Sequence, residues 1–206
     1  MTDRVRVCSA GTRFAAGLLT TAELSVAARR GDALVPFDRR MTLPAPVTRT
    51  GRRAWLAVTA LGSRPVAYGL VAARCLLPER TGRSALDRYL PVLVLAGGDA
   101  ARTVLCRAVD RPRPPAEERL APCDGASFPS RHTALALMAT GLATGAGPAV
   151  AGAVGAAVGL SRIALRVHWP TDVVGGWLFG HGWLAAAEMA GACRSRSGPA
   201  IQGPFG

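Results

Sequence analysis

Lysine is missing from this sequence, although the chain carries a formal net charge of +12. All 25 basic residues are therefore arginines, set against 13 acidic residues. Such a surplus can indicate nucleic-acid binding. However, the arginines form no compact block, the chain has no zinc-finger spacing, and aromatic residues make up only 5% of it. We expect no nucleic-acid partner, and assign a few arginines to phosphate binding, because a guanidinium group directs two N–H donors at a phosphate.

Closely spaced metal ligands are also missing. The five cysteines are widely separated and form no CxxC pair, which predicts neither a zinc site nor a disulfide framework. No cluster of carboxylates suits magnesium, so we expect no metal and no other cofactor. The cysteines, which we expect to be free thiols, are Cys8, Cys75, Cys106, Cys123 and Cys193.

Long uninterrupted apolar runs are scarce, although half of the residues are apolar. Residues 14–28 are interrupted by Glu23 and fall short of the roughly 20 residues of a membrane span. An interfacial or buried helix fits this stretch as well. Residues 29–53 then form a polar connector that contains proline.

Beyond this connector, apolar segments alternate with short polar turns, which predicts an all-α membrane bundle of about five to six helices. We divide the chain into an N-terminal helix and connector (1–53), a helical core (54–193) and a disordered tail (194–206). Asp99 and Arg102 are expected to pair on one helix face. The helices of the core are expected at 65–77, 89–105, 133–146, 148–165 and 172–192.

Three polar stretches occupy the ends of these helices: residues 110–114, 128–132 and 161–172. Each has an ordinary explanation when taken alone, as a stiff connector, a serine cap or a packed histidine. In an up-and-down bundle, however, successive helices deliver all three stretches to the same end. We therefore predict a catalytic pocket at one rim of the bundle.

The order and spacing of these stretches resemble the type-2 phosphatidic acid phosphatase family, which shares its pocket with vanadium haloperoxidases. The family's pattern is KxxxxxxRP, PSGH and SRxxxxxHxxxD, and this chain has CRAVDRPRP, PSRH and SRIALRVHWPTD. The third motif matches at all four fixed positions. Cys106 stands where the family has lysine, and Arg131 stands where it has glycine.

The resemblance implies three catalytic residues. His168 attacks phosphorus and forms a phosphohistidine. Asp172 holds the other ring nitrogen of His168, and a turn at Pro170 must bring the two together. His132 protonates the leaving group and then activates water.

The resemblance also implies a cradle for the phosphate. Its expected members are Arg113, Arg162, Ser130 and Arg131. The N–H groups that open the helix after Ser130 add anion-binding donors. Arg131 or Arg102 could replace the cation lost at Cys106, whereas Arg111 receives no role.

By the same resemblance, the substrate is a lipid phosphate of the phosphatidate or prenyl phosphate type, including diphosphates. The protein is then integral to the cell membrane, with its pocket on the extracytoplasmic side. Two alternatives stay open: a soluble phosphatase for small phosphate esters, and a non-catalytic membrane protein that keeps a degenerate anion-binding pocket. Extraction without detergent would favour the first, and the replacements at Cys106 and Arg131 favour the second. The sequence does not indicate an oligomeric state.

Overall fold

The computed structural model describes residues 2–29, 34–41, 48–77 and 85–197. Within these ranges the chain forms eight α-helices, one short 3₁₀ turn at Ala116–Glu118 and no strand, which confirms the all-α prediction. The expected number of five to six helices was too low. The helices are α1 (Thr2–Arg29), α2 (Val35–Met41), α3 (Arg49–Ala60), α4 (Arg64–Leu76), α5 (Ala85–Val109), α6 (Arg131–Thr144), α7 (Pro148–Ala164) and α8 (Pro170–Ser197).

The additional helices lie in and beside the segment that was expected to be a polar connector. Helix α2 lies within it, and α3 begins there because the Thr48 side chain accepts the N–H of Gly51 at 3.1 Å and caps the helix. The break at Arg64–Pro65 separates two helices, with Pro65 in the first turn of α4, where its missing N–H costs nothing.

The last helix is longer than expected. Helix α8 continues to Ser197 and thus includes the first residues of the tail that was predicted to be disordered. The remainder of that tail, 198–206, lies outside the described residues.

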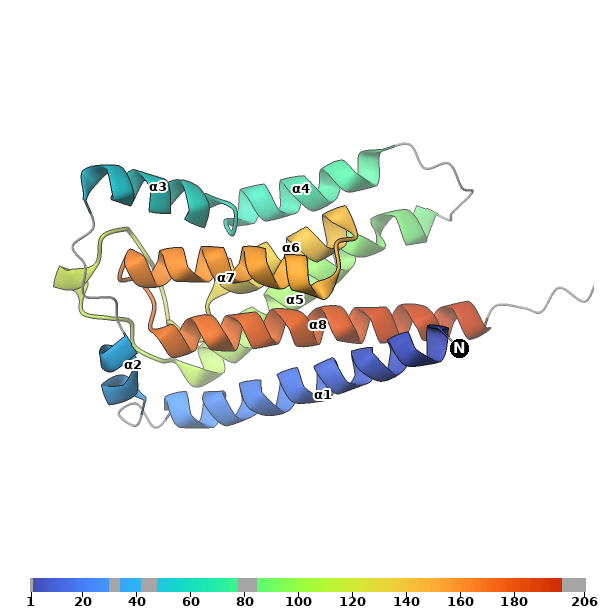
Figure 1. Ribbon diagram of the computed structural model, residues 1–206, viewed down its shortest axis with the longest axis horizontal. Helices are drawn as coiled ribbons and strands as arrows, with labels where there is room; N and C mark the ends of the chain where they lie inside the picture. The colour runs from blue at the N-terminus through green and yellow to red at the C-terminus, as the bar shows by residue number, and fades with distance from the viewer. Residues whose placement is uncertain (1, 30–33, 42–47, 78–84, 198–206) are drawn as a thin grey trace, which may run out of the picture.

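Helix α6 lies at the centre of the bundle, which is why it has no polar face. Its residues 133–139 are all buried, and they pack against Val71 of α4 and Leu95 of α5. Figure 1 shows α1 running along α8, with α7 beside α8 and the α3–α4 pair above them. The C-terminal ends of α5 and α7 and the N-terminal ends of α6 and α8 lie at the same end of the molecule.

Three glycines allow close packing around the start of α6. A Cβ atom at Gly175 would collide with the Phe128 ring, and one at Gly176 would collide with the carbonyl oxygen of Ser130. In the break between α3 and α4, a Cβ atom at Gly62 would collide with the carbonyl oxygen of His132. The backbones of α8 and of the α3–α4 break therefore fix the position of the first turn of α6.

Judged by length and apolar content, none of the described helices could cross a bilayer by itself. Helices α3 and α4, which meet at a bend of 45°, satisfy the same criterion only as a pair.

Candidate active site

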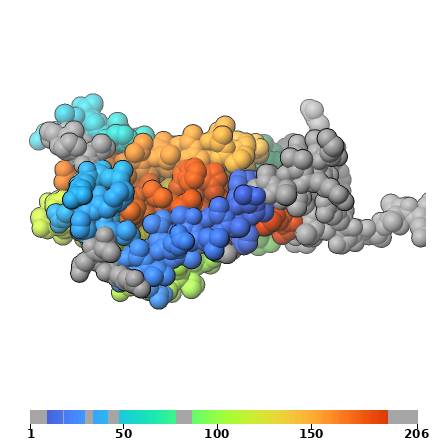
Figure 2. Space-filling model, turned by 60° about the horizontal axis from the view of Figure 1, so that its bottom comes forward, coloured from blue at the N-terminus to red at the C-terminus, as the bar shows by residue number. Residues whose placement is uncertain are grey.

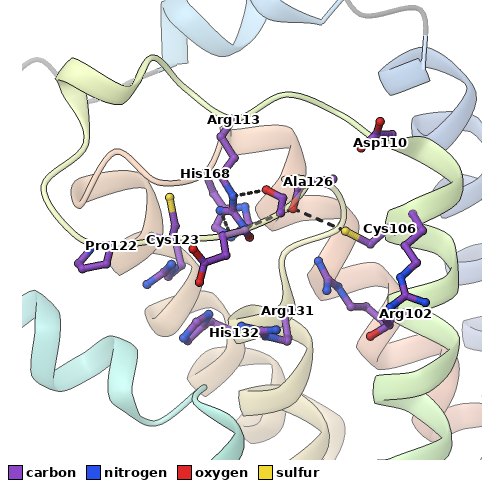
Figure 3. Close-up of a pocket in the computed structure, with 15 residues that line it drawn as sticks. Arg102, Cys106, Asp110, Arg113, Pro122, Cys123, Ala126, Arg131, His132 and His168 are labelled. Carbon is purple, nitrogen blue, oxygen red and sulfur yellow. Dashed lines mark hydrogen bonds between the residues drawn. The ribbon is translucent and has the colours of Figure 1, made fainter.

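All three polar stretches meet at one end of the bundle, as the sequence predicts. They line a cavity of about 470 Å³ (Figure 3). Five of the seven predicted site residues lie in its wall: Arg113, Arg131, His132, Arg162 and His168. The resemblance requires His132 and His168 to meet at one cavity, and both residues line this cavity.

Asp172 lies directly behind His168, in the first turn of α8. Its Oδ2 atom accepts the backbone N–H of Trp169 at 2.9 Å and lies 3.3 Å from Nδ1 of His168. This carboxylate therefore caps the start of α8 while it holds the imidazole ring. The turn that begins at Pro170 brings the two side chains together, as expected.

The contacts of His168 define its tautomer. Its Nε2 atom lies 3.1 Å from Nη1 of Arg113, which can only donate, so Nε2 acts as the acceptor. We therefore assign the proton to Nδ1, toward Asp172, so that Nε2 carries the lone pair and accepts from Arg113, which lines the same cavity.

The pKa of His168 favours a neutral imidazole ring. Burial lowers this pKa to about 4, and the charges of Arg113 and Arg162 act in the same direction against the hydrogen bond to Asp172. Burial alone would raise the pKa of Asp172, but its hydrogen bond to His168 and the charge of Arg111 outweigh burial and lower it. At neutral pH the pair is a neutral imidazole and a carboxylate, as a histidine nucleophile requires.

Two arginines are held beside His168. Arg162, in the last turn of α7, donates from Nη1 to the Thr59 hydroxyl oxygen of α3 at 3.0 Å. Burial and the charge of Arg113 lower the pKa of Arg162 to about 10, so it remains a cation at neutral pH. Arg113 donates to the carbonyl oxygens of Gly125 at 2.8 Å and Val167 at 2.7 Å. Both cations are thus fixed in place before an anion binds.

Ser130 lies apart from the cavity wall. It is fully buried, and its hydroxyl oxygen accepts a hydrogen bond from Thr133 at 3.0 Å instead of capping α6. The first N–H groups of a helix have no partner within the helix, so the start of α6 offers donors at Arg131 and His132, which do line the cavity. The structure therefore brings Arg131 and His132, but not the Ser130 hydroxyl, to the cavity wall.

Arginines surround the position of the missing lysine. The Cys106 thiol donates to the carbonyl oxygen of Ala126 at 3.5 Å, and Arg102, Arg107 and Arg131 line the same cavity. Three cations from other positions thus line the cavity to which Cys106 also belongs.

The expected pairing of Asp99 with Arg102 is wrong. Asp99 accepts instead from Nε of Arg64 at 2.7 Å, because α4 begins beside this part of α5. Arg102 donates from Nε and Nη2 to the carbonyl oxygen of Pro129, at 2.8 and 2.6 Å. Arg102 therefore anchors the loop that leads into α6 and at the same time lines the cavity.

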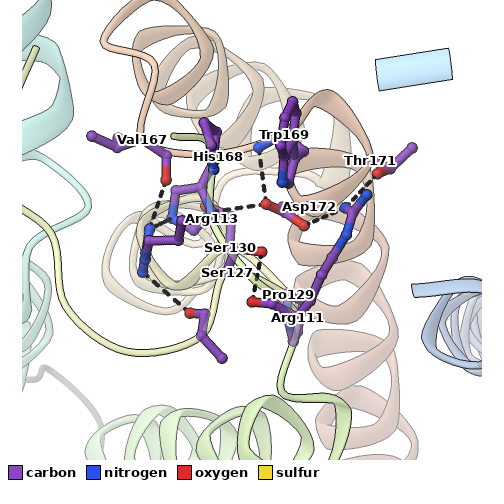
Figure 4. Close-up of polar contacts among 12 residues, drawn as sticks. Arg111, Arg113, Ser127, Pro129, Ser130, Val167, His168, Trp169, Thr171 and Asp172 are labelled. Carbon is purple, nitrogen blue, oxygen red and sulfur yellow. Dashed lines mark hydrogen bonds and ion pairs between the residues drawn. The ribbon is translucent and has the colours of Figure 1, made fainter. Parts of the chain in front are cut away.

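Two buried charges lie behind Asp172: Arg111, which the sequence left without an assigned role beyond a possible outer charge, and Asp38, which it did not single out. Arg111 is 1% exposed and donates to Oδ1 of Asp172 at 2.6 Å (Figure 4). It also donates to Oδ2 of Asp38 at 2.6 Å. Arg111 is the first arginine of the RPRP run that the sequence analysis singled out. Asp38 carries no signal, since it is one acid among the arginines of the connector.

Metal-binding groups are not evident in this region. Across residues 2–29, 34–41, 48–77 and 85–197, no three His, Cys, Asp or Glu side chains come together in a way that could hold a metal ion.

A neutral histidine backed by a carboxylate, a second histidine and fixed arginines at the rim of a helical bundle define a site suited to phosphoryl transfer. Residues 89–190 match the model of the PAP2 superfamily. The chain belongs to this superfamily, that of the type-2 phosphatidic acid phosphatases, and the assignment supports a phosphatase.

Among solved structures, the chain is similar to a transmembrane PAP2-type phosphatidylglycerolphosphate phosphatase from Bacillus subtilis. The two share 22% identity and a TM-score of 0.67, over 89% of this chain and 96% of the other. This likeness concerns the fold. No curated protein matches the chain significantly.

Proposed function

We propose that the protein hydrolyses a lipid phosphate ester through a phosphohistidine on His168. The observation that carries the proposal is a neutral His168 whose unprotonated Nε2 is held by Arg113 at a cavity that Arg113 and Arg162 also line. The incoming phosphate would take the Arg113 N–H and free the Nε2 lone pair. In the first step Nε2 bonds to phosphorus, the ester P–O bond breaks, and His132 gives a proton to the departing alkoxide.

In the second step His132 removes a proton from water, the hydroxide attacks phosphorus, and the P–N bond breaks. Phosphate leaves, and His168 returns to its starting form. Throughout, Arg113, Arg162 and the N–H groups at the start of α6 offset the negative charge on the oxygens of phosphorus. Asp172 stabilises the charged ring while the P–N bond exists.

The surface of the bundle supports a membrane setting for this chemistry. Large apolar side chains are exposed along α1, α3–α4, α5, α7 and α8, which is unusual for a helical surface that faces only water. They include Leu19, Val26, Leu70, Leu93, Val104, Val150, Leu160 and Val174. A lipid tail could then stay among apolar surroundings while its phosphate enters the cavity. The solved neighbour is described as transmembrane, which agrees with this setting.

The substrate we favour is a phosphate monoester of a lipid, of the phosphatidate or phosphatidylglycerolphosphate kind, or a prenyl phosphate. We further propose that the cavity faces the extracytoplasmic side. Arg194 and Arg196 stand at the far end of α8 from the cavity, and the positive-inside tendency favours the cytoplasm for that end.

Phosphate release by the purified protein tests the proposal. The panel comprises phosphatidate, phosphatidylglycerolphosphate, a prenyl phosphate and its diphosphate in detergent micelles, and a water-soluble phosphate monoester. We expect faster release from the lipids, no loss in EDTA, and inhibition by vanadate, which mimics the five-coordinate phosphorus. Preference for the soluble ester, together with extraction without detergent, would favour the soluble alternative. No release from any ester by folded protein would leave only an anion-binding pocket.

The pH profile should be that of an acid phosphatase. Burial, together with the charges of Arg162, His168, Arg131 and Arg113, lowers the pKa of His132 to about 2, so the empty site holds two neutral histidines. The ester must then bring its own proton to His132, and a phosphate monoester loses that proton above about pH 6.

We therefore expect kcat/KM to be bell-shaped against pH. The rate falls below pH 4 as His168 becomes protonated, with its pKa of about 4, and falls above about pH 6 as the monoanionic ester disappears. Initial rates at low substrate concentration between these limits measure the profile. A maximum in alkaline solution would contradict this protonation scheme.

A further inference from the structure

The carboxylate behind His168 is the start of a longer buried chain of charges that leads away from the cavity. Asp172 binds Arg111 (Figure 4), and Arg111 in turn binds Asp38 of α2. All three side chains are at most 1% exposed. Removing charges from water in this way is costly unless each is paired, so the three groups depend on one another.

Thr171 hydrogen-bonds to both Arg111 and Asp38 in this row of buried charges. Its hydroxyl accepts from Nη1 of Arg111 at 2.7 Å and donates to Oδ2 of Asp38 at 2.8 Å. Its backbone N–H also donates to Oδ1 of Asp38 at 2.9 Å. Asp38 therefore holds the first turn of α8, in which Asp172 lies, through both the backbone and a side chain.

The two carboxylate oxygens of Asp172 have different partners. Oδ2 faces His168 and the N–H of Trp169, whereas Oδ1 is bound by Arg111. A cation on Oδ1 draws negative charge away from Oδ2 and weakens its hold on the imidazole ring. A second carboxylate on the far side of the same guanidinium balances that cation.

We propose that Asp38 is a positioning residue for the phosphatase site, which acts through Arg111 and Thr171 to hold Asp172 against His168 and to preserve its negative charge. The role rests on the function proposed above for His168. Asp38 lies outside residues 89–190, the part that matches the family model, so the N-terminal segment completes the support of the site.

Two substitutions should move the titration of His168 in opposite directions. Asp38→Asn leaves the Arg111 cation unbalanced, which disfavours the imidazolium and lowers its pKa. Arg111→Gln removes that cation and raises the pKa. We expect shifts of about half a pH unit or more, since charges interact strongly in a buried site. The other charged or titratable groups facing His168 are Arg113 of the loop, Arg162 of α7 and His132 of α6, and both variants keep them.

The experiment follows the ring of His168 by NMR in histidine-labelled full-length protein. The chain has three histidines, so His132→Gln and His181→Gln variants assign the signals. Arg40→Gln, an exposed position on α2, is the matched control and should leave the titration unchanged. In parallel, the pH at which kcat/KM falls on the acidic side should be lower for Asp38→Asn and higher for Arg111→Gln than for wild type. The Asp38 variant should also lose about tenfold in kcat, the scale of effect when an outer partner of a histidine ligand is removed.

The outcomes separate this proposal from the function on which it rests. Opposite shifts of the His168 signal support the positioning role even if no ester is hydrolysed. Unshifted titration in both variants, with activity lost only in proportion to thermal stability, would overturn it. If either variant fails to fold, Thr171→Val removes the hydroxyl bridge without changing charge. It should lower kcat by a few-fold and move the titration in the Asp38→Asn direction, and an unchanged titration would count against the proposal.

Discussion

Replacing His168 with asparagine is expected to lower kcat/KM by about 10⁴-fold or more, the scale of loss when a catalytic nucleophile is removed. Asparagine can still donate to Asp172, but it has no lone pair that attacks phosphorus. Arg113, Arg162 and the start of α6 remain, so substrate binding should change much less than turnover. Steady-state kinetics with the best lipid of the panel measures both quantities.

A covalent label gives the same prediction a direct readout. With a substrate radiolabelled at phosphorus, rapid acid-free quenching should trap label on wild-type protein, stable to alkali and lost in acid, as expected of phosphohistidine. His181→Asn is the matched control, because His181 packs against the Trp177 ring at 4.1 Å, away from the cavity. Equal turnover by wild type and His168→Asn, or label that persists in the variant, would contradict the mechanism.

The pair of His168 and Asp172 was predictable because its determinants are local. The two residues are four positions apart, and Pro170 between them starts a helix whose third residue is the acid. The helix cap and the orientation of the ring then follow from the same carboxylate. The common rim was predictable for a different reason: in an up-and-down bundle each helix begins at the end of the molecule where the previous helix stops.

The charge pairings could not be predicted, because they depend on tertiary packing. Asp99 and Arg102 have the spacing of a helical pair, yet Arg64 from another helix takes the carboxylate. Asp38 shows the same limit more strongly, since its partner Arg111 lies 73 residues away. An acid among the arginines of a polar connector gives no sign that it will be buried, and the short helix that carries Asp38 was not expected.

Ser130 shows that a matched motif does not fix the role of each member. It stands at the predicted position and begins α6, but its hydroxyl is turned toward Thr133 and lies outside the cavity wall. Its backbone N–H donates to the carbonyl oxygen of Asp172 at 2.9 Å and so joins α6 to α8. Its proposed part in phosphate binding remains a prediction, whereas its structural part is clear.

The effect of replacing His132 should depend on how basic the leaving group is. His132→Gln is expected to lower kcat for a lipid phosphate by about 10²- to 10⁴-fold, the usual contribution of a positioned acid or base. The alkoxide that leaves a lipid ester is strongly basic and needs a proton as its bond breaks. A nitrophenolate is stable without one, so formation of the phosphohistidine from p-nitrophenyl phosphate should be almost unaffected.

The second step separates this role from a loss of binding. Without a base to activate water, the phosphohistidine formed from p-nitrophenyl phosphate should accumulate in His132→Gln, giving a burst of nitrophenol followed by slow turnover. Cys123→Ser is a suitable control, because Cys123 lines the same cavity without a place in the proposed chemistry. Equal losses in the burst and in turnover, for both kinds of ester, would mean that His132 only shapes the cavity. A burst at the wild-type rate, followed by slow turnover, would instead assign the proton transfers to His132. Its position at the start of α6 is fixed by the close packing of Gly62 against its backbone.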